Sequence, residues 1–69
     1  MTVREKELLE FVIQFKQTNG FSPTVREIAN GINTKSTDHV RNMLHELMDK
    51  GYLSMREKSP RTIVVKKFI

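Results

Sequence analysis

The tetrapeptide Thr-Val-Arg-Glu occurs twice in this chain, at residues 2–5 and again at residues 24–27. A threonine with a glutamate three positions later is a capping box, in which each side chain satisfies a free backbone amide at the start of a helix. The repeat therefore predicts helices that begin near Val3 and Val25. The residues after the two copies differ, so the pattern marks two helix starts and not a structural duplication.

Apolar residues follow each box at the spacing of an amphipathic helix. They predict a first helix over residues 3–19, ended by Gly20, which suits the left-handed conformation of a helix cap. The segment Phe21-Ser22-Pro23 should then be extended, because a residue before proline avoids the helical conformation. A second helix is predicted over residues 25–32, from the apolar side chains of Val25, Ile28, Ala29 and Ile32.

A third helix is predicted over residues 37–50. The short turn Asn33-Thr34-Lys35 precedes it, and asparagine tolerates the left-handed conformation that such a turn requires. Ser36 is a suitable N-cap for this helix, and Gly51 marks its end. One side of the helix carries a continuous apolar stripe, formed by Val40, Met43, Leu44, Leu47 and Met48.

The last part of the chain has the composition of a hairpin. Residues 52–55 and 62–65 are rich in β-forming side chains, and the residues between them are charged and turn-prone. These runs predict a hairpin over about 52–66, whereas Phe68-Ile69 could cover the core edge or contact another subunit. Two short helices joined by a tight turn and followed by a hairpin are typical of a winged helix-turn-helix. The expected fold is one mostly helical α+β domain over residues 1–69, with three helices and a C-terminal β-hairpin wing.

The net charge of +4 is concentrated at one end of the chain. The first fifty residues carry seven basic and seven acidic side chains, whereas the remainder carries five basic side chains and only one acidic side chain. A localised basic surface favours a polyanion as partner, such as nucleic acid or a membrane. A well-solvated surface without a partner explains the charge equally well.

The side-chain inventory favours neither catalysis nor metal binding. The chain has no cysteine, no glycine-rich phosphate loop and no carboxylate pair beside an expected pocket. His39 and His45 are six residues apart, which directs them to different faces of a helix. We therefore expect no enzyme activity, cofactor, metal or small-molecule substrate. The chain also has neither an apolar run near the roughly 20 residues of a membrane span nor a secretion signal, so the expected location is the cytoplasm.

The exposed side of the third helix is the candidate DNA-binding site. Its first half carries side chains that suit base edges, since arginine pairs with guanine, asparagine with adenine, and aspartate with the amino group of cytosine. Its second half carries Glu46 and Asp49, which phosphates repel, so the helix should approach DNA by its N-terminal end. The candidate base contacts are Ser36, Asp38, His39, Arg41 and Asn42, with His45 one turn later. The expected phosphate contacts of the hairpin are Arg56, Lys58 and Arg61.

Each of these assignments has an ordinary structural alternative. Asp38 could instead stabilise the positive end of its own helix. Arg41, Asn42 and the two histidines could be exposed side chains without a ligand, and the cations of the hairpin could be solvated.

The chain resembles the N-terminal DNA-binding domain of LexA-type repressors from Thr2 to Arg61. The resemblance is carried by residues 19–29, Asn-Gly-Phe-Ser-Pro-Thr-Val-Arg-Glu-Ile-Ala, by residues 44–53, Leu-His-Glu-Leu-Met-Asp-Lys-Gly-Tyr-Leu, and by Ser-Pro-Arg at 59–61. It implies a winged helix-turn-helix that binds operator DNA through the start of the third helix, where Ser36, Asp38, His39, Arg41 and Asn42 lie.

The departures from the family pattern limit what the resemblance implies. The usual glycine of the turn is Asn33 here, and the residues at the start of the third helix differ from those of familiar repressors, so no operator sequence can be transferred. The self-cleaving domain with its serine-lysine pair and dimer interface is absent, so self-cleavage is not expected of this chain alone.

The leading hypothesis is a sequence-specific regulator, most simply a repressor, that binds double-stranded DNA at a two-fold symmetric operator, with a possible homodimer on DNA. An alternative is a winged-helix adaptor that binds another protein and has only weak, non-specific affinity for DNA. An adaptor should expose an aromatic or aliphatic anchor, whereas the third helix begins with polar side chains. Binding to structured RNA is disfavoured because the A-form major groove is too narrow for a helix.

Overall fold

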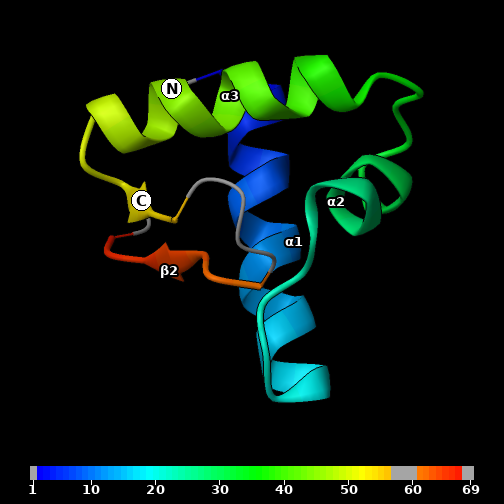
Figure 1. The fold of residues 1–69 in the computed structure, drawn as a ribbon, viewed down its shortest axis with the longest axis vertical. Coiled ribbons are helices and arrows are strands. Elements are labelled where there is room, and N and C mark those ends of the chain that lie inside the picture. The colour runs from blue at the N-terminus through cyan, green and yellow to red at the C-terminus, as the bar shows by residue number, and fades with distance from the viewer. Residues whose placement is uncertain (1, 57–60, 68–69) are drawn as a thin grey trace.

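The computed structural model describes residues 2–56 and 61–67, which form three helices and a small antiparallel sheet. Helix α3 lies across α1, α2 packs beside both, and the sheet lies at the C-terminal end of α3 (Figure 1). This arrangement confirms the winged helix-turn-helix predicted from the sequence. The elements are α1 (Val3–Asn19), α2 (Val25–Gly31), α3 (Thr37–Asp49), β1 (Leu53–Ser54) and β2 (Val64–Val65).

Both predicted capping boxes are present, and they explain where α1 and α2 begin. The hydroxyl of Thr2 accepts a hydrogen bond from the Glu5 amide at 3.1 Å, and the Glu5 carboxylate accepts one from the Thr2 amide at 2.9 Å. Thr24 and Glu27 form the same pair of bonds, at 3.2 and 2.8 Å. At the other end of α1, Gly20 has the predicted left-handed conformation, with φ of 83°. These local signals were sufficient to predict the helix starts.

Helix α2 ends at Gly31, within one residue of the expected end near Ile32. A Cβ atom on Gly31 would overlap the ring of Phe11, so the close approach of α1 and α2 requires glycine there. Ile32 leaves the helical conformation, and its carbonyl accepts a hydrogen bond from Arg4 Nη1 at 2.9 Å. Asn33 then takes the left-handed conformation, with φ of 61°, as the sequence predicts. The residue that follows α2 is therefore hydrogen-bonded to the start of α1.

The core lies where the three helices and the sheet meet. Leu8 and Leu9 of α1, Ile28 of α2 and Leu47 of α3 are completely buried. The apolar stripe predicted for α3 faces inward, except that Met48 is only half-buried. The buried apolar side chains are Leu8, Leu9, Val12, Ile28, Ala29, Ile32, Val40, Met43, Leu44, Leu47, Leu53 and Ile63.

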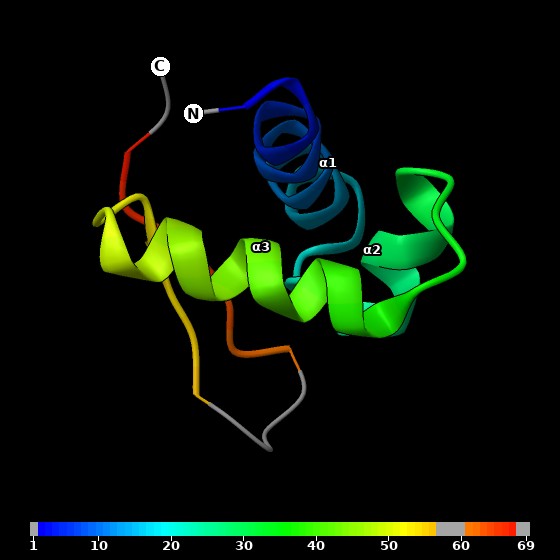
Figure 2. The ribbon, with the colours of Figure 1, turned by 90° about the horizontal axis from the view of Figure 1, so that it is seen from above.

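The hairpin has shorter strands than the run of β-forming residues suggests. Leu53 pairs with Val65 and Ser54 with Val64. Beyond this short ladder, the side chain of Thr62 bonds to the backbone N–H and carbonyl of Arg56, at 2.9 and 3.2 Å, and so holds the two arms together. Seen from above, these arms extend to the side of α3 opposite α1 (Figure 2).

The longest helix, α1, has 17 residues, and none of the helices in the described ranges combines the length and apolar character of a bilayer span.

Candidate nucleic-acid interface

Helix α3 has a buried side and an exposed side, and the predicted base contacts lie on the exposed one. Val40 and Leu44 are packed inside the core. All the predicted base contacts are exposed, namely Ser36, Asp38, His39, Arg41, Asn42 and His45. If these polar residues were buried, α3 could not contact DNA through them. They are exposed, so the outer side of α3 is a polar surface.

The first turn of α3 is fixed by its own cap. The hydroxyl of Ser36 accepts a hydrogen bond from the His39 amide at 3.1 Å, and the Ser36 amide donates to the Thr34 hydroxyl at 3.4 Å. Ser36 is therefore an N-cap, as predicted, and its hydroxyl hydrogen is left to serve an acceptor outside the helix. Asp38 lies in the first turn, where the positive end of the helix favours a carboxylate. Both roles that the sequence left open for Asp38 are compatible with this position.

The connection between α2 and α3 is ordered by backbone hydrogen bonds. The Ile32 amide donates to the Ile28 carbonyl and the Thr34 amide to the Ala29 carbonyl, each at 2.9 Å. With Asn33 in the left-handed conformation between them, the chain turns sharply enough to direct the start of α3 outward. These contacts define the angle between the two helices of the helix-turn-helix.

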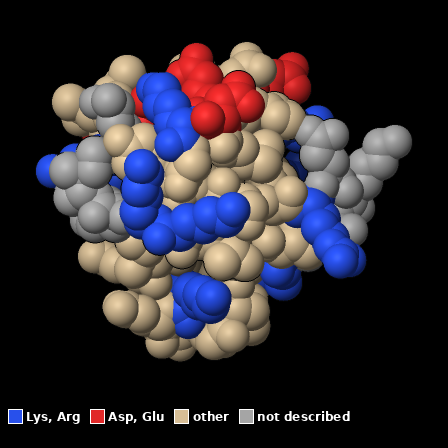
Figure 3. Space-filling model, turned by 90° about the vertical axis from the view of Figure 1, so that its left-hand side faces the viewer, with Lys and Arg blue, Asp and Glu red and all other residues tan. Residues whose placement is uncertain are grey.

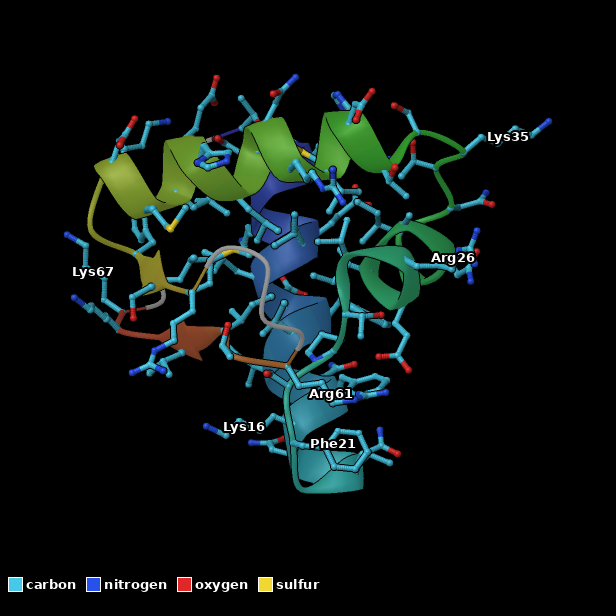
Figure 4. All side chains as sticks on the ribbon, in the orientation of Figure 1. Lys16, Phe21, Arg26, Lys35, Arg61 and Lys67 are labelled. Carbon is cyan, nitrogen blue, oxygen red and sulfur yellow. The ribbon has the colours of Figure 1, made fainter. Side chains whose placement is uncertain are left out.

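Two cations near the start of α3 were not included in the predicted site. Lys35 immediately precedes the N-cap and its side chain points away from the protein, and Arg26 projects from α2 on the same side (Figure 4). Both side chains are exposed. A lysine next to an N-cap was visible in the sequence as a possible phosphate ligand, because phosphate binds favourably at helix N-termini.

Charge is distributed unequally along α3. Arg41 is its only lysine or arginine, and Glu46 and Asp49 lie near its C-terminal end. In the face shown in Figure 3, acidic side chains gather at the top, where α3 lies, and basic side chains gather below them. The C-terminal half of α3 would therefore repel a phosphate backbone, which supports an approach by the N-terminal half.

The hairpin cations are placed differently from one another. Arg56 is exposed at the end of the first arm, and Lys58 lies outside the described residues. Arg61 has a left-handed backbone, with φ of 61°, and its side chain folds back on the start of α2 (Figure 4). There it forms two hydrogen bonds with the Glu27 carboxylate, at 3.0 and 3.2 Å. The sequence predicted a phosphate contact for Arg61 and did not anticipate this ion pair.

Two glutamates have lowered pKa values for physical reasons that the structure makes clear. The backbone N–H of Thr24, and after it the guanidinium of Arg61, hold the pKa of Glu27 below its ordinary value. The backbone N–H of Thr2 does the same for the pKa of Glu5, assisted by the Lys50 ammonium at 3.5 Å. Both carboxylates are therefore charged at neutral pH and stabilise the fold through these contacts.

The part of the chain that the structure describes has no cluster of side chains that could hold a metal ion. No three histidine, aspartate or glutamate side chains within residues 2–56 and 61–67 lie close enough together to hold a metal ion. A shallow hollow between α1 and the sheet has Lys16 as its one charged lining residue, so it provides no acid and base pair. The other residues lining it are Val12, Ile13, Gln17, Ile63 and Val65.

A helix-turn-helix with an outward polar start of its third helix, followed by a two-stranded hairpin, defines the class of winged helix-turn-helix domains. Comparison with known proteins narrows the class to one family. The profile described as LexA DNA binding domain matches residues 1–62. The chain belongs to the family of LexA DNA-binding domains.

Relatives of the chain include LexA repressors of several organisms. It is 39% identical over 67 residues to the LexA repressor of Myxococcus xanthus, covering 97% of this chain and 30% of that protein. It is 37% identical over 62 residues to the LexA repressor of Ruminiclostridium cellulolyticum, covering 90% and 29%. For the LexA repressor of Staphylococcus aureus the identity is 34% over 65 residues, covering 94% and 31%. The chain thus spans about three tenths of the length of the relatives it matches.

Proposed function

We propose that this chain binds double-stranded DNA sequence-specifically, as the operator-binding part of a LexA-like transcriptional repressor, and that it has no enzyme activity. The observation that carries the proposal is the outward polar start of α3, where Ser36 caps the helix and Arg41 and Asn42 are exposed. A helix end of this kind fits the major groove, which admits an α-helix. Family membership supports the same function.

In this proposal the first two turns of α3 carry the base contacts. Arg41 would donate two hydrogen bonds to guanine, Asn42 would pair with adenine, and Asp38 would accept from the amino group of cytosine. His39 and His45 complete the exposed row, and the Ser36 hydroxyl remains a donor. The operator sequence itself depends on which of these side chains meet which base.

Contacts with the phosphate backbone would come from both sides of α3. Lys35 precedes the helix, and Arg26 projects on the side of α2. Arg56 is exposed on the hairpin, and Lys58 follows it in the sequence. Such contacts set the orientation of the protein on the duplex and do not read sequence.

The operator would have two-fold symmetry, because one short helix reads only a few base pairs and two copies are needed for a longer site. The two copies would meet on DNA as a homodimer. We propose the cytoplasm as the location, since the chain would act on the DNA of its cell.

The exposed apolar side chains disfavour the alternative of a protein adaptor that uses α3. Among residues 2–56 and 61–67, the large apolar side chains that are well exposed are Val3, Phe21 and Val64, and none of them lies on α3. The outward side of α3 therefore lacks the hydrophobic anchor that an adaptor helix needs.

Selection from random duplex DNA tests the proposal directly. The purified chain should enrich a symmetric site, and fluorescence anisotropy should show tighter binding to that site than to scrambled duplex. The affinity should fall steeply with salt, because phosphate contacts release counterions. Enrichment of no sequence, with equal weak binding to every duplex, would overturn the proposal and favour the adaptor.

A further inference from the structure

The side chain of Arg61 joins the hairpin to the beginning of the helix-turn-helix. Its Nη1 atom lies 3.0 Å from Glu27 Oε1 and its Nη2 atom 3.2 Å from Glu27 Oε2. Nη1 also donates to the Ser22 carbonyl at 3.2 Å. The guanidinium carbon lies 4.5 Å above the centre of the Phe21 ring. The Arg61 side chain thus contacts three groups, one on α2 and two on the segment that precedes it.

The residues that receive Arg61 are themselves fixed in place. The capping box with Thr24 orients the Glu27 carboxylate independently of Arg61. The ring of Phe21 is held against Phe15 of α1, with ring centroids 5.9 Å apart. A carboxylate and an aromatic face placed in this way match the shape and charge of a planar guanidinium.

We infer that Arg61 is a positioning residue, which fixes the hairpin relative to α2 and therefore to α3. This role replaces the phosphate contact predicted from the sequence, and it rests on the proposed DNA binding. Three of the five N–H donors of Arg61 already serve Glu27 and Ser22. The Glu27 carboxylate beside the guanidinium also repels phosphate. Glu27 then acts twice, because it caps α2 and also sets the angle of the hairpin.

Three single variants separate positioning from phosphate contact. Glu27→Gln keeps a side chain that can complete a capping box but removes the charge facing Arg61. Arg61→Lys keeps the positive charge but loses the planar fork, and Arg61→Gln loses both. Lys35→Gln is the matched control, because it removes one exposed cation that the structure leaves near the start of α3.

Affinity for the selected operator should be measured over a range of salt concentrations. We expect Glu27→Gln, Arg61→Lys and Arg61→Gln each to weaken binding by roughly tenfold, within the range for residues in one contact network. The double variant Glu27→Gln/Arg61→Gln should be no weaker than either single variant. The slope of log affinity against log salt concentration should stay unchanged in the three single variants and in the double variant. Lys35→Gln should lower this slope by about one unit.

Opposite results would overturn the inference. If Arg61 contacts phosphate, Arg61→Lys retains most of the affinity, Arg61→Gln lowers the salt slope, and Glu27→Gln leaves binding unchanged or tighter.

Hydrogen exchange on the free protein tests the same contact without DNA. The Lys66 amide, which bonds to the Tyr52 carbonyl at 2.7 Å, should exchange faster in Arg61→Lys than in the native protein, while amides in the middle of α1 stay protected. Unchanged exchange at Lys66 would contradict positioning even if the native chain failed to bind DNA, a failure that would concern the proposed function alone.

Discussion

Arg41 is the exposed arginine of α3, and its position follows directly from the fold. It lies outside the buried stripe of α3, and its side chain is exposed. No other lysine or arginine belongs to this helix. Its charge and its two-pronged donor geometry are therefore available for guanine, which is the base that arginine pairs with most often.

Arg41→Ala should weaken binding to the selected operator by about 1–3 kcal/mol and relax the preference at one base position. The loss should be small on scrambled duplex, because the removed contact reads a base. Binding titrations with single-base operator variants measure both effects. Lys16→Ala removes the same charge from α1, away from α3, and serves as the control (Figure 4). An unchanged preference in Arg41→Ala would contradict the docking by the start of α3.

Lys58→Ala should behave differently from Arg41→Ala, since Lys58 is proposed to contact phosphate. We expect it to weaken binding to all duplexes by a similar factor and to lower the salt slope by about one unit. Titrations of operator and scrambled DNA at several salt concentrations provide the measurement. Loss of discrimination between the two duplexes would instead assign Lys58 to a base.

Sequence reasoning succeeded for residues whose behaviour depends on near neighbours. The exposure of Asn42 and the left-handed turn at Asn33 follow from local spacing and local conformational preference. The ion pair of Arg61 with Glu27 joins residues 34 positions apart, so no local pattern predicts it. The signal that placed Arg61 near DNA was its charge, and charge alone does not specify a partner.

At the scale of elements, the contact between α1 and α2 depends on a glycine, Gly31, which has no side chain. The ring of Phe11 occupies the space that a Cβ atom of Gly31 would need. Phe11 also packs against Phe15, with centroids 5.8 Å apart, so the ring has limited freedom to move. Glycine at position 31 therefore allows α1 and α2 to approach each other closely.

Gly31→Ala should therefore destabilise the protein by about 1–3 kcal/mol, the usual cost of overpacking, despite the higher helix propensity of alanine. Urea unfolding followed by circular dichroism measures the change. The additional substitution Phe11→Leu should remove the overlap and recover part of the loss in the double variant. A stabilised Gly31→Ala protein would show that the ring moves aside freely.

The starts of α1 and α2 were more predictable than the end of α2 and the extent of the strands. Capping boxes with Thr2 and Thr24 act within one turn, and both helices begin where these boxes predict. The end of α2 and the short pairing of β1 with β2 depend on packing between segments that are distant in sequence. Apolar and β-forming patterns contain no information on where such packing stops.

For the whole molecule, the lowered pKa values of Glu5 and Glu27 predict a loss of stability in acid. Each carboxylate is ionised more readily in the folded protein than in the unfolded chain. The stability that they contribute is fully present above the unfolded pKa of about 4.3, and it is lost as pH falls through the lower folded values.

Urea unfolding between pH 7 and pH 3 should therefore show constant stability near neutrality and a decline below about pH 4. Glu5→Gln should reduce the stability at pH 7 and flatten this decline. Glu7→Gln is a suitable control, because the ion pair of Glu7 with Arg4 on the same helix is exposed and contributes little stability. A stability that rises on acidification would contradict the stabilising role of both carboxylates.

The opening turn of α1 links the far ends of the other two helices. Arg4 bonds to the carbonyl of Ile32 just after α2, and Glu5 pairs with Lys50 just after α3. A fusion partner or affinity tag at the amino terminus would be joined next to this junction, whose helix cap uses the Thr2 amide. Purification tags and fluorescent labels for binding studies are therefore better placed elsewhere, because strain at the junction would reach the helix that is proposed to enter DNA.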